Sequence, residues 1–536
     1  HALRAPHALV VSAHALASEI GARVMLEGGN AVDAAVAVGF ALAVTHPSAG
    51  NIGGGGFMVI RRPDGRATTI DFREKAPLAV TPDMFLDSTG EYSYERHHRS
   101  HLAVGVPGTV AGLALAHERY GDADWADLVE PAVRLARDGF HLSEALAGSF
   151  ERGLDDFAPY PASVAKFSND GTPYATGELW RQPDLARTLA RIRDDGADGF
   201  YRGETARLIA AEMRRGGGLI TERDLARYEA VEREPIRGTF RGWDVISMPP
   251  PSSGGVALVE MLNILEGFEL RALGHNSAPY LHHLAEAMRL AYRDRARWLA
   301  DTDFVDVPID RLTSESYAGT LRSLIDPARA GHSAPADVAL VPEGQHTTHY
   351  SVIGPDGTAV AVTYTIEQGY GSKITVPGAG FLLNNEMGDF NPVAGLTTED
   401  GLIGTPANLV APGKRMLSSM TPTILASGGR VAVVGSPGGR TIINTVLQVI
   451  LGLTVFDIGI MDAVDAGRIH HQWLPDEIEI EGDVVPASVV AALRAMGHAV
   501  DVGGEQGAAN SAVVTADGTR VGAPDPRGAD AAAAGW

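Results

Sequence analysis

Two adjacent threonines, Thr347 and Thr348, open a strand-like stretch about two-thirds of the way along the chain. A threonine hydroxyl is a weak nucleophile unless a base lies beside it. The α-amine of an N-terminal residue has a pKa of about 7.7–8.0 and can act as that base. If the peptide bond between His346 and Thr347 were cut, Thr347 would carry both groups. The spacing alone also fits a simpler interpretation, in which both threonines are β-forming residues at the start of a strand.

The turn at Ser436–Gly439 could serve the same chemistry. Its glycines let backbone N–H groups approach a ligand closely, and a predicted helix begins at Arg440. The N-terminal end of a helix favours negative charge, which would suit an oxyanion hole. An ordinary strand-to-helix turn explains the same residues.

Composition excludes several other chemistries. The chain of 536 residues has no cysteine, which excludes disulfides, thiolate nucleophiles and cysteine-based zinc sites. Its net charge of −22 argues against a nucleic-acid partner. The longest apolar stretch, 31–44, is too short to span a bilayer and contains Asp33, so no membrane span is expected.

Neither the glycine run nor the histidines match a cofactor motif. The run at 50–56 lacks the Lys-Ser/Thr of a phosphate-binding loop. His97 and His101 have i, i+4 spacing, but no His-Glu-x-x-His motif accompanies them. We therefore expect no cofactor and no catalytic metal. Four other histidines are expected to pack or hydrogen-bond, namely His282, His283, His470 and His471.

Four predicted β-hairpins share one pattern, an apolar run, a Gly-containing turn and a second run. They lie at 57–72, 348–364, 421–435 and 511–523. Most of the intervening sequence has the apolar period of helices, and two helices are expected within 8–46. Further helices are expected at 107–121, 126–140, 252–268, 278–300 and 440–453. Stacked sheets inside and helices outside would bury both kinds of apolar face.

The segment before Thr347 has no regular period. Residues 326–346 are rich in Pro, Ala and Gly. A loop of that length in a compact protein is usually functional or disordered. Exposure there would suit a cleavage site.

Eleven stretches, in the same order along nearly the whole chain, resemble the γ-glutamyltranspeptidase (glutathione hydrolase) family. They include GNIGGGGFMVI, IDFREKAP, TTHYSVIGPDG, LLNNEMGDFN and VGSPGGRTIINTVLQ. The resemblance implies the N-terminal-nucleophile hydrolase fold. That is an α/β (α+β) fold, a four-layer αββα sandwich with two stacked antiparallel sheets, which agrees with the four predicted hairpins.

The resemblance also implies a precursor that cuts itself. The cut would fall between His346 and Thr347 and give a large subunit, 1–346, and a small subunit, 347–536. Thr347 would be the nucleophile that takes up the γ-glutamyl group. Thr365 would hydrogen-bond the hydroxyl of that nucleophile.

The family pattern further assigns the contacts to substrate. Arg73 would bind the α-carboxylate of the donor, because a guanidinium matches a carboxylate fork. Taken singly, each such residue would more often be a surface charge or a turn residue. The remaining contacts are Ser418 and Ser419 for the carboxylate, Glu367, Glu386 and Asp389 for the α-ammonium, and Gly438 and Gly439 for the oxyanion.

Two positions depart from the family pattern. Glu367 stands where many members have Asn, although an added negative charge still suits an ammonium group. Asp400 falls in the segment over the pocket where some members place an aromatic gate. The balance between hydrolysis and transfer therefore stays open.

The predicted activity is that of a γ-glutamyltransferase and glutathione hydrolase without a cofactor. Donors would be γ-glutamyl compounds such as glutathione, and acceptors would be water, amino acids or dipeptides. One alternative is a glutaryl-type cephalosporin acylase, against which the three carboxylates argue. Another is an uncleaved, non-catalytic scaffold. The start at His1, without Met or an apolar leader, suits either an exported protein or a cloning choice, and a periplasmic or extracellular location is expected.

Overall fold

The computed structural model describes residues 2–335, 347–396, 398–399, 404–482 and 484–536. Two seven-stranded sheets form its centre, and every strand pairing within them is antiparallel. In spatial order the first sheet contains β1 (Leu3–Ala5), β18 (Arg520–Ala523), β17 (Ser511–Val514), β13 (Arg430–Val434), β12 (Thr423–Ser427), β9 (Trp243–Ser247) and β8 (Ile236–Phe240). The second contains β19 (Ala532–Gly535), β2 (Leu9–Ser12), β10 (Thr347–Ile353), β11 (Ala359–Thr365), β3 (Gly55–Arg61), β4 (Ala67–Asp71) and β7 (Val231–Arg233).

The helices form two groups, one on each side of the sheets. On the side of the second sheet are α1 (Ala15–Leu26), α2 (Ala31–Thr45), α3 (Thr109–Tyr120), α4 (Trp125–Asp138), α5 (Glu144–Phe157), α6 (Pro161–Phe167), α7 (Pro183–Asp195), α8 (Asp198–Tyr201), α9 (Gly203–Gly216) and α10 (Glu222–Ala226). On the side of the first are α11 (Gly254–Glu266), α12 (Leu270–Leu273), α13 (Ala278–Trp298), α14 (Ile309–Leu312), α15 (Glu315–Arg322), α16 (Thr441–Thr454), α17 (Ile460–Asp465) and α18 (Ala487–Ala495). Two small sheets pair β5 (Phe140–His141) with β6 (Leu179–Trp180), and β15 (Ile478–Glu481) with β14 (Ile469–His470) and β16 (Val500–Gly503).

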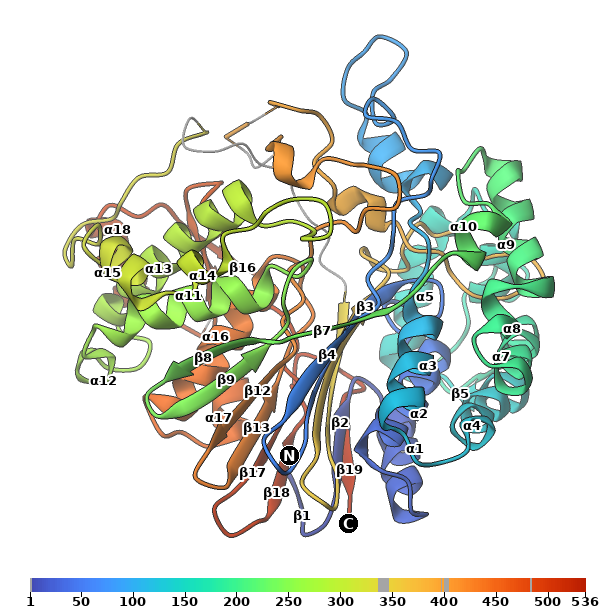
Figure 1. Cartoon of the computed structure of the whole chain (residues 1–536), viewed down its shortest axis with the longest axis horizontal. Coiled ribbons are helices and arrows are strands. Elements are labelled where there is room, and N and C mark those ends of the chain that lie inside the picture. Colours follow the sequence, from blue (N-terminus) through green and yellow to red (C-terminus); the bar gives the residue numbers. More distant parts are fainter. Residues whose placement is uncertain (1, 336–346, 397, 400–403, 483) are drawn as a thin grey trace.

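The two large sheets stack face to face, and the helices cover their outer faces (Figure 1). Apolar side chains fill the space between the sheets, among them Leu9, Val59, Ile353 and Ile424. Helices α1, α2 and α3 lie on the second sheet, and α11, α16 and α17 lie on the first. This is the predicted four-layer αββα sandwich, and each layer buries its apolar face against the next.

All four predicted hairpins are confirmed, as β3–β4, β10–β11, β12–β13 and β17–β18. The helices predicted at 107–121, 126–140, 252–268, 278–300 and 440–453 are confirmed as α3, α4, α11, α13 and α16. The prediction of helix from residue 8 was wrong at its start. Leu9–Ser12 form β2 between β19 and β10, and α1 begins only at Ala15. All four residues of β2 are buried, and a short, fully buried strand has the same continuous apolar run as a buried helix.

Helix α2 occupies the longest apolar stretch of the sequence and is buried along its whole length. Its N-cap, Asn30, accepts hydrogen bonds from the N–H groups of Val32 and Asp33, and the Asp33 side chain accepts one from the N–H of Asn30. This reciprocal cap fixes the start of the helix under the second sheet. In the described part of the chain, no helix has both the length and the apolar character needed to cross a bilayer.

Candidate active site

The β10–β11 hairpin brings two hydroxyl groups together. Thr347, the first residue of β10, lies opposite Thr365, the last residue of β11. Side chains paired in this way share a face, with Cβ atoms about 4.5–5.5 Å apart. Both residues are buried, and the Thr365 hydroxyl oxygen accepts a hydrogen bond from the N–H of Glu367 (2.8 Å). A hydroxyl that accepts one bond can still donate its own proton.

The glycine run before β3 lets other backbone segments approach this hairpin. A Cβ on Gly54 would lie 2.0 Å from the carbonyl oxygen of Thr365, and a Cβ on Gly53 would lie 2.0 Å from that of Leu382. The Asn51 amide also donates to the Thr365 carbonyl (2.9 Å). Close backbone packing therefore accounts for these glycines.

The turn before α16 presents two backbone amides. Gly438 and Gly439 have φ angles of +128° and +57°, a region that favours glycine. The Thr441 hydroxyl donates to the Gly438 carbonyl (2.9 Å), which holds the turn against the helix. Within the residues that the structure describes, the N–H groups of Gly438 and Gly439 donate to no protein acceptor. Both can therefore serve a ligand at the N-terminal end of α16.

Arg73 is fully buried beside the hairpin. Its guanidinium donates to the carboxylates of Glu386 and Asp389 and to the carbonyl oxygens of Met416 (3.2 Å) and Leu417 (2.9 Å). The sequence predicts that the cation and the carboxylates bind opposite ends of a substrate. Here they pair with each other, so each group keeps a counter-charge.

Two carboxyl groups next to Arg73 have raised pKa values. Glu74 lies 3.7 Å from the Arg73 guanidinium, and Glu386 is hydrogen-bonded to it. Burial raises the pKa of each carboxyl group, and the charge of Arg73 offsets only part of that effect. These two buried carboxyl groups therefore hold protons more readily than exposed carboxyl groups would.

The two serines occupy a tightly bonded loop. The Ser418 hydroxyl accepts a hydrogen bond from the N–H of Met420 (3.1 Å), and the Ser418 carbonyl accepts one from the N–H of Ser253 (2.7 Å). The Ser419 hydroxyl accepts from the guanidinium of Arg295 (2.8 Å), which also donates to the Ser253 hydroxyl (2.8 Å). These bonds fix the backbone on which both hydroxyls stand.

Glu367 has an uncommon backbone conformation, with a φ of +77°. Its carboxylate lies 3.8 Å from Nδ1 of His98, and the ring of Tyr94 stacks on that histidine at 4.5 Å. Burial lowers the pKa of His98 to about 4, so the ring is neutral at pH 7. The Glu367 charge is therefore not neutralised by His98 at that pH.

Most of the predicted site residues line one small pocket, of about 230 Å³ including its open mouth. They are Arg73, Thr347, Thr365, Glu367, Glu386, Asp389, Ser418, Ser419 and Gly439. Gly438 instead lines a larger cleft, of about 1660 Å³ including its open mouth, which Thr347 lines as well. Thr347 therefore faces both spaces. His346 and Asp400 lie outside the described residues.

Comparison with known proteins gives the family. The model of the gamma-glutamyltranspeptidase family matches residues 17–535. The chain belongs to this family. It is 47% identical to the glutathione hydrolase proenzyme of Escherichia coli strain K12, over 100% of this chain and 93% of that protein.

Solved structures of related enzymes have the same fold. The cephalosporin acylase from Bacillus halodurans is similar with a TM-score of 0.87 at 26% identity, over 100% of this chain and 97% of that one. The gamma-glutamyltranspeptidase of Helicobacter pylori is similar with a TM-score of 0.59 at 46% identity. That match covers 59% of this chain and 91% of the other.

Two neighbours of the pocket residues were not predicted from the sequence. Glu74 directly follows Arg73, and adjacent charges in a buried stretch could have indicated it. Arg295 supports Ser419 from a position 124 residues away, on α13, and no local pattern indicates that contact. The histidines expected to pack or hydrogen-bond do so, for example His283 with the Pro279 carbonyl (2.7 Å) and His470 with the Gln472 side chain (2.9 Å). His97 contacts the Phe390 carbonyl (3.1 Å) and His101 contacts Glu212 (2.8 Å).

Proposed function

We propose that this protein is a γ-glutamyltransferase and glutathione hydrolase with Thr347 as its nucleophile. The main support for the proposal is the small pocket. Nine residues from distant parts of the sequence line it, and they include the groups needed to bind and transfer a γ-glutamyl group. The printed name of the Escherichia coli relative supports glutathione as a donor. A periplasmic or extracellular location is part of the proposal.

The nucleophile would arise from a cut between His346 and Thr347. The Thr347 oxygen would attack the carbonyl carbon of His346, the peptide C–N bond would become an ester, and water would hydrolyse it. The products would be subunits 1–346 and 347–536. The word proenzyme in the name of the Escherichia coli relative supports this step.

The donor would bind as a zwitterion in the small pocket. Its α-carboxylate would take the Arg73 guanidinium, with Ser418 and Ser419 donating beside it. Its α-ammonium would lie among the carboxylates of Asp389, Glu367 and Glu386. Arg73 is paired with Glu386 and Asp389 in this structure. On binding, the substrate carboxylate would pair with Arg73 and the substrate ammonium with the two carboxylates, so no buried charge would be left unpaired.

Acyl transfer would then follow in two steps. The Thr347 oxygen attacks the γ-carbonyl carbon, and the α-amine of Thr347 takes the hydroxyl proton. The N–H groups of Gly438 and Gly439 stabilise the oxyanion, an effect of about 3 kcal/mol per donor in such sites. The leaving amine takes the proton as the C–N bond breaks. Water or the amine of an acceptor attacks the Thr347 ester and releases the glutamyl product.

A cephalosporin-type acylase is the second candidate, because the Bacillus halodurans acylase has the same fold. A glutaryl group lacks the α-ammonium, so Glu367, Glu386 and Asp389 would face an apolar methylene. Burying carboxylates without a cation is costly. We expect faster turnover of γ-glutamyl-p-nitroanilide than of glutaryl-p-nitroanilide, and the opposite preference would favour the acylase.

The deciding experiment is Thr347→Ala. We expect this variant to stay in one piece on a denaturing gel and to release no p-nitroaniline, while the parent gives two bands and turns over. Thr348→Ala is the matched control and should still be cut, because only the residue at the cut supplies both amine and hydroxyl. A parent that stays whole would instead support a scaffold, and an active Thr347→Ala would contradict the proposed nucleophile.

A further inference from the structure

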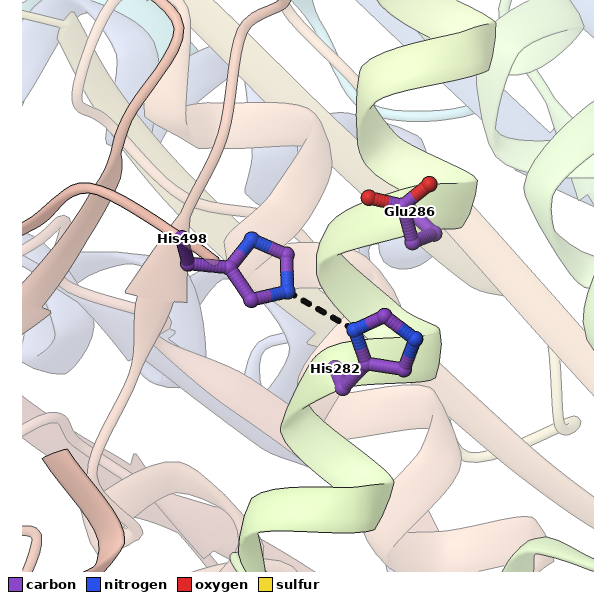
Figure 2. Close-up of side chains that lie close together, drawn as sticks. All are labelled: His282, Glu286 and His498. Carbon is purple, nitrogen blue, oxygen red and sulfur yellow. Dashed lines mark hydrogen bonds between the residues drawn. The ribbon is translucent and has the colours of Figure 1, made fainter. Parts of the chain in front are cut away.

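A buried cluster of two histidines and a glutamate lies outside both spaces that Thr347 lines. His282 and Glu286 stand one turn apart on α13, and His498 faces them from the turn between α18 and β16 (Figure 2). One ring nitrogen of each histidine and a carboxylate oxygen of Glu286 lie within 4.8 Å of one another. All three side chains are buried.

The hydrogen bonds determine which nitrogen carries each proton. Nε2 of His282 lies 2.7 Å from the carbonyl oxygen of Asp326, which only accepts, so this nitrogen carries a hydrogen. In the neutral ring, Nδ1 of His282 then has a lone pair. That lone pair faces Nε2 of His498 at 2.7 Å, so the proton between the rings belongs to His498.

We propose that this cluster binds one divalent transition-metal ion, through Nδ1 of His282, Nε2 of His498 and the carboxylate of Glu286. Two imidazoles and one carboxylate are a ligand set for Zn²⁺, Co²⁺ or Ni²⁺. The ion replaces the proton between the rings, and that proton moves to Nδ1 of His498. Metal–nitrogen bonds are about 2.0–2.1 Å long, so the two nitrogens must separate slightly beyond their present distance.

The surroundings already have the arrangement of an outer shell. A metal-bound histidine usually donates its other N–H to a carbonyl or a carboxylate, as His282 does to Asp326. Glu286 accepts one bond from the N–H of Gly331 (3.0 Å) and two from the Arg289 guanidinium (2.6 and 3.4 Å). A carboxylate has about four acceptor positions, so these three bonds leave one for a metal. The Arg289 charge lowers the affinity for a cation.

The ion would join three separate parts of the chain. His282 and Glu286 belong to α13, His498 precedes β16, and the two α13 side chains also hold the backbone of Asp326 and Gly331. Binding to the folded state alone raises the free energy of unfolding. The expected consequence is a higher melting temperature with metal, and the turnover that depends on Thr347 is not required to change.

The test uses protein purified without a histidine tag and stripped with a chelator. Co²⁺ is titrated while its visible absorption is recorded, and bound metal per chain is counted by elemental analysis after gel filtration. We expect one Co²⁺ per chain in the parent. His283→Ala is the matched control, because His283 neighbours the cluster on α13 but its Nδ1 bonds the Pro279 carbonyl (2.7 Å).

His498→Ala and Glu286→Gln should both weaken binding. Losing an outer-shell partner alone costs about 10–100-fold in metal affinity, so losing a ligand should cost at least about tenfold. Melting without metal and turnover of γ-glutamyl-p-nitroanilide establish that each variant is folded. Equal binding by His498→Ala and His283→Ala, or no Co²⁺ bound by the folded parent, would overturn the proposal.

Discussion

At the level of single residues, the pocket contains a buried cation, Arg73, that is paired with the carboxylates of Glu386 and Asp389. Arg73 is fully buried, yet two carboxylates and two carbonyl oxygens accept its hydrogen bonds. Removing one partner of such a pair leaves an uncompensated charge, which typically costs about 3–5 kcal/mol. Only a ligand that carries both a carboxylate and an ammonium can enter without that cost. The pocket should therefore favour donors that carry an α-amino acid group.

Glu367 allows charge and backbone strain to be tested separately. Its φ of +77° is unfavourable for most side chains, but Asn tolerates it. We expect Glu367→Asn to raise the melting temperature and Glu367→Gln to leave it lower than that of the Asn variant. Both should raise KM for γ-glutamyl-p-nitroanilide, because both remove a carboxylate from the pocket. Calorimetry and steady-state kinetics measure the two effects, and an unchanged KM in both variants would exclude the contact.

Glu74 predicts a pH dependence of stability. The free side chain titrates near 4.5, whereas burial raises the pKa of Glu74 in the folded protein. Between those two values the folded state holds a proton that the unfolded state has lost. The contribution of Glu74 to the free energy of unfolding should therefore fall as pH rises from about 4.5 to about 7, and should stay constant above that range.

Glu74→Gln should remove this part of the pH dependence. At pH 8 we expect the melting temperature of the variant to equal or exceed that of the parent. At pH 4 the two proteins should differ less, because Glu74 of the parent is largely protonated in both the folded and the unfolded state. Glu118→Gln is the control, because Glu118 is exposed on α3. If the substitution lowered the melting temperature relative to the parent more at pH 8 than at pH 4, the charged Glu74 would stabilise the fold, which is the opposite of this prediction.

At the level of elements, the hairpins were predictable and the pairing between distant elements was not. An apolar run, a turn and a second run identify β10–β11 because their information is local. The partners of Arg73 lie 313 and 316 residues away, and only the family resemblance placed them in one site. Strand β2 was misread because a buried strand and a buried helix have the same apolar run. The contact between His282 and His498 had no local signal at all.

The glycine run makes a prediction for the junction of β3 and β11. A Cβ at Gly54 would lie 2.0 Å from the Thr365 carbonyl oxygen, so Gly54→Ala must push the strands apart. Overpacking of this kind costs about 1–3 kcal/mol, and it should also lower kcat by shifting Thr365. Gly319→Ala, where nothing lies within 4 Å of the new Cβ, should leave turnover unchanged and raise the melting temperature slightly, because Ala is favoured over Gly inside a helix such as α15.

At the level of the whole molecule, the predicted cut divides neither sheet into separable halves. In the second sheet β10 lies between β2 and β11, and β11 pairs with β3, so chain segments from both sides of residue 347 alternate. In the first sheet β12 pairs with β9 in the same way. The two subunits would therefore share one core and could not fold apart.

Because the two subunits share both sheets, the cut and the uncut protein should differ in how their unfolding depends on protein concentration. The processed parent should elute as one species in high salt, because hydrogen-bonded strands and apolar contacts join its subunits. In denaturant its unfolding releases two chains, so its midpoint should rise with protein concentration. Thr347→Ala unfolds as a single chain, and its midpoint should be independent of concentration.

Circular dichroism at two protein concentrations about a hundredfold apart measures the shift of the midpoint. The shift should be detectable, since a tenfold change in an equilibrium constant corresponds to about 1.4 kcal/mol. If the unfolding midpoint of the processed protein did not depend on its concentration, the two subunits would have to stay joined after unfolding. A cut in the backbone between them does not allow that, so this result would contradict the predicted cut.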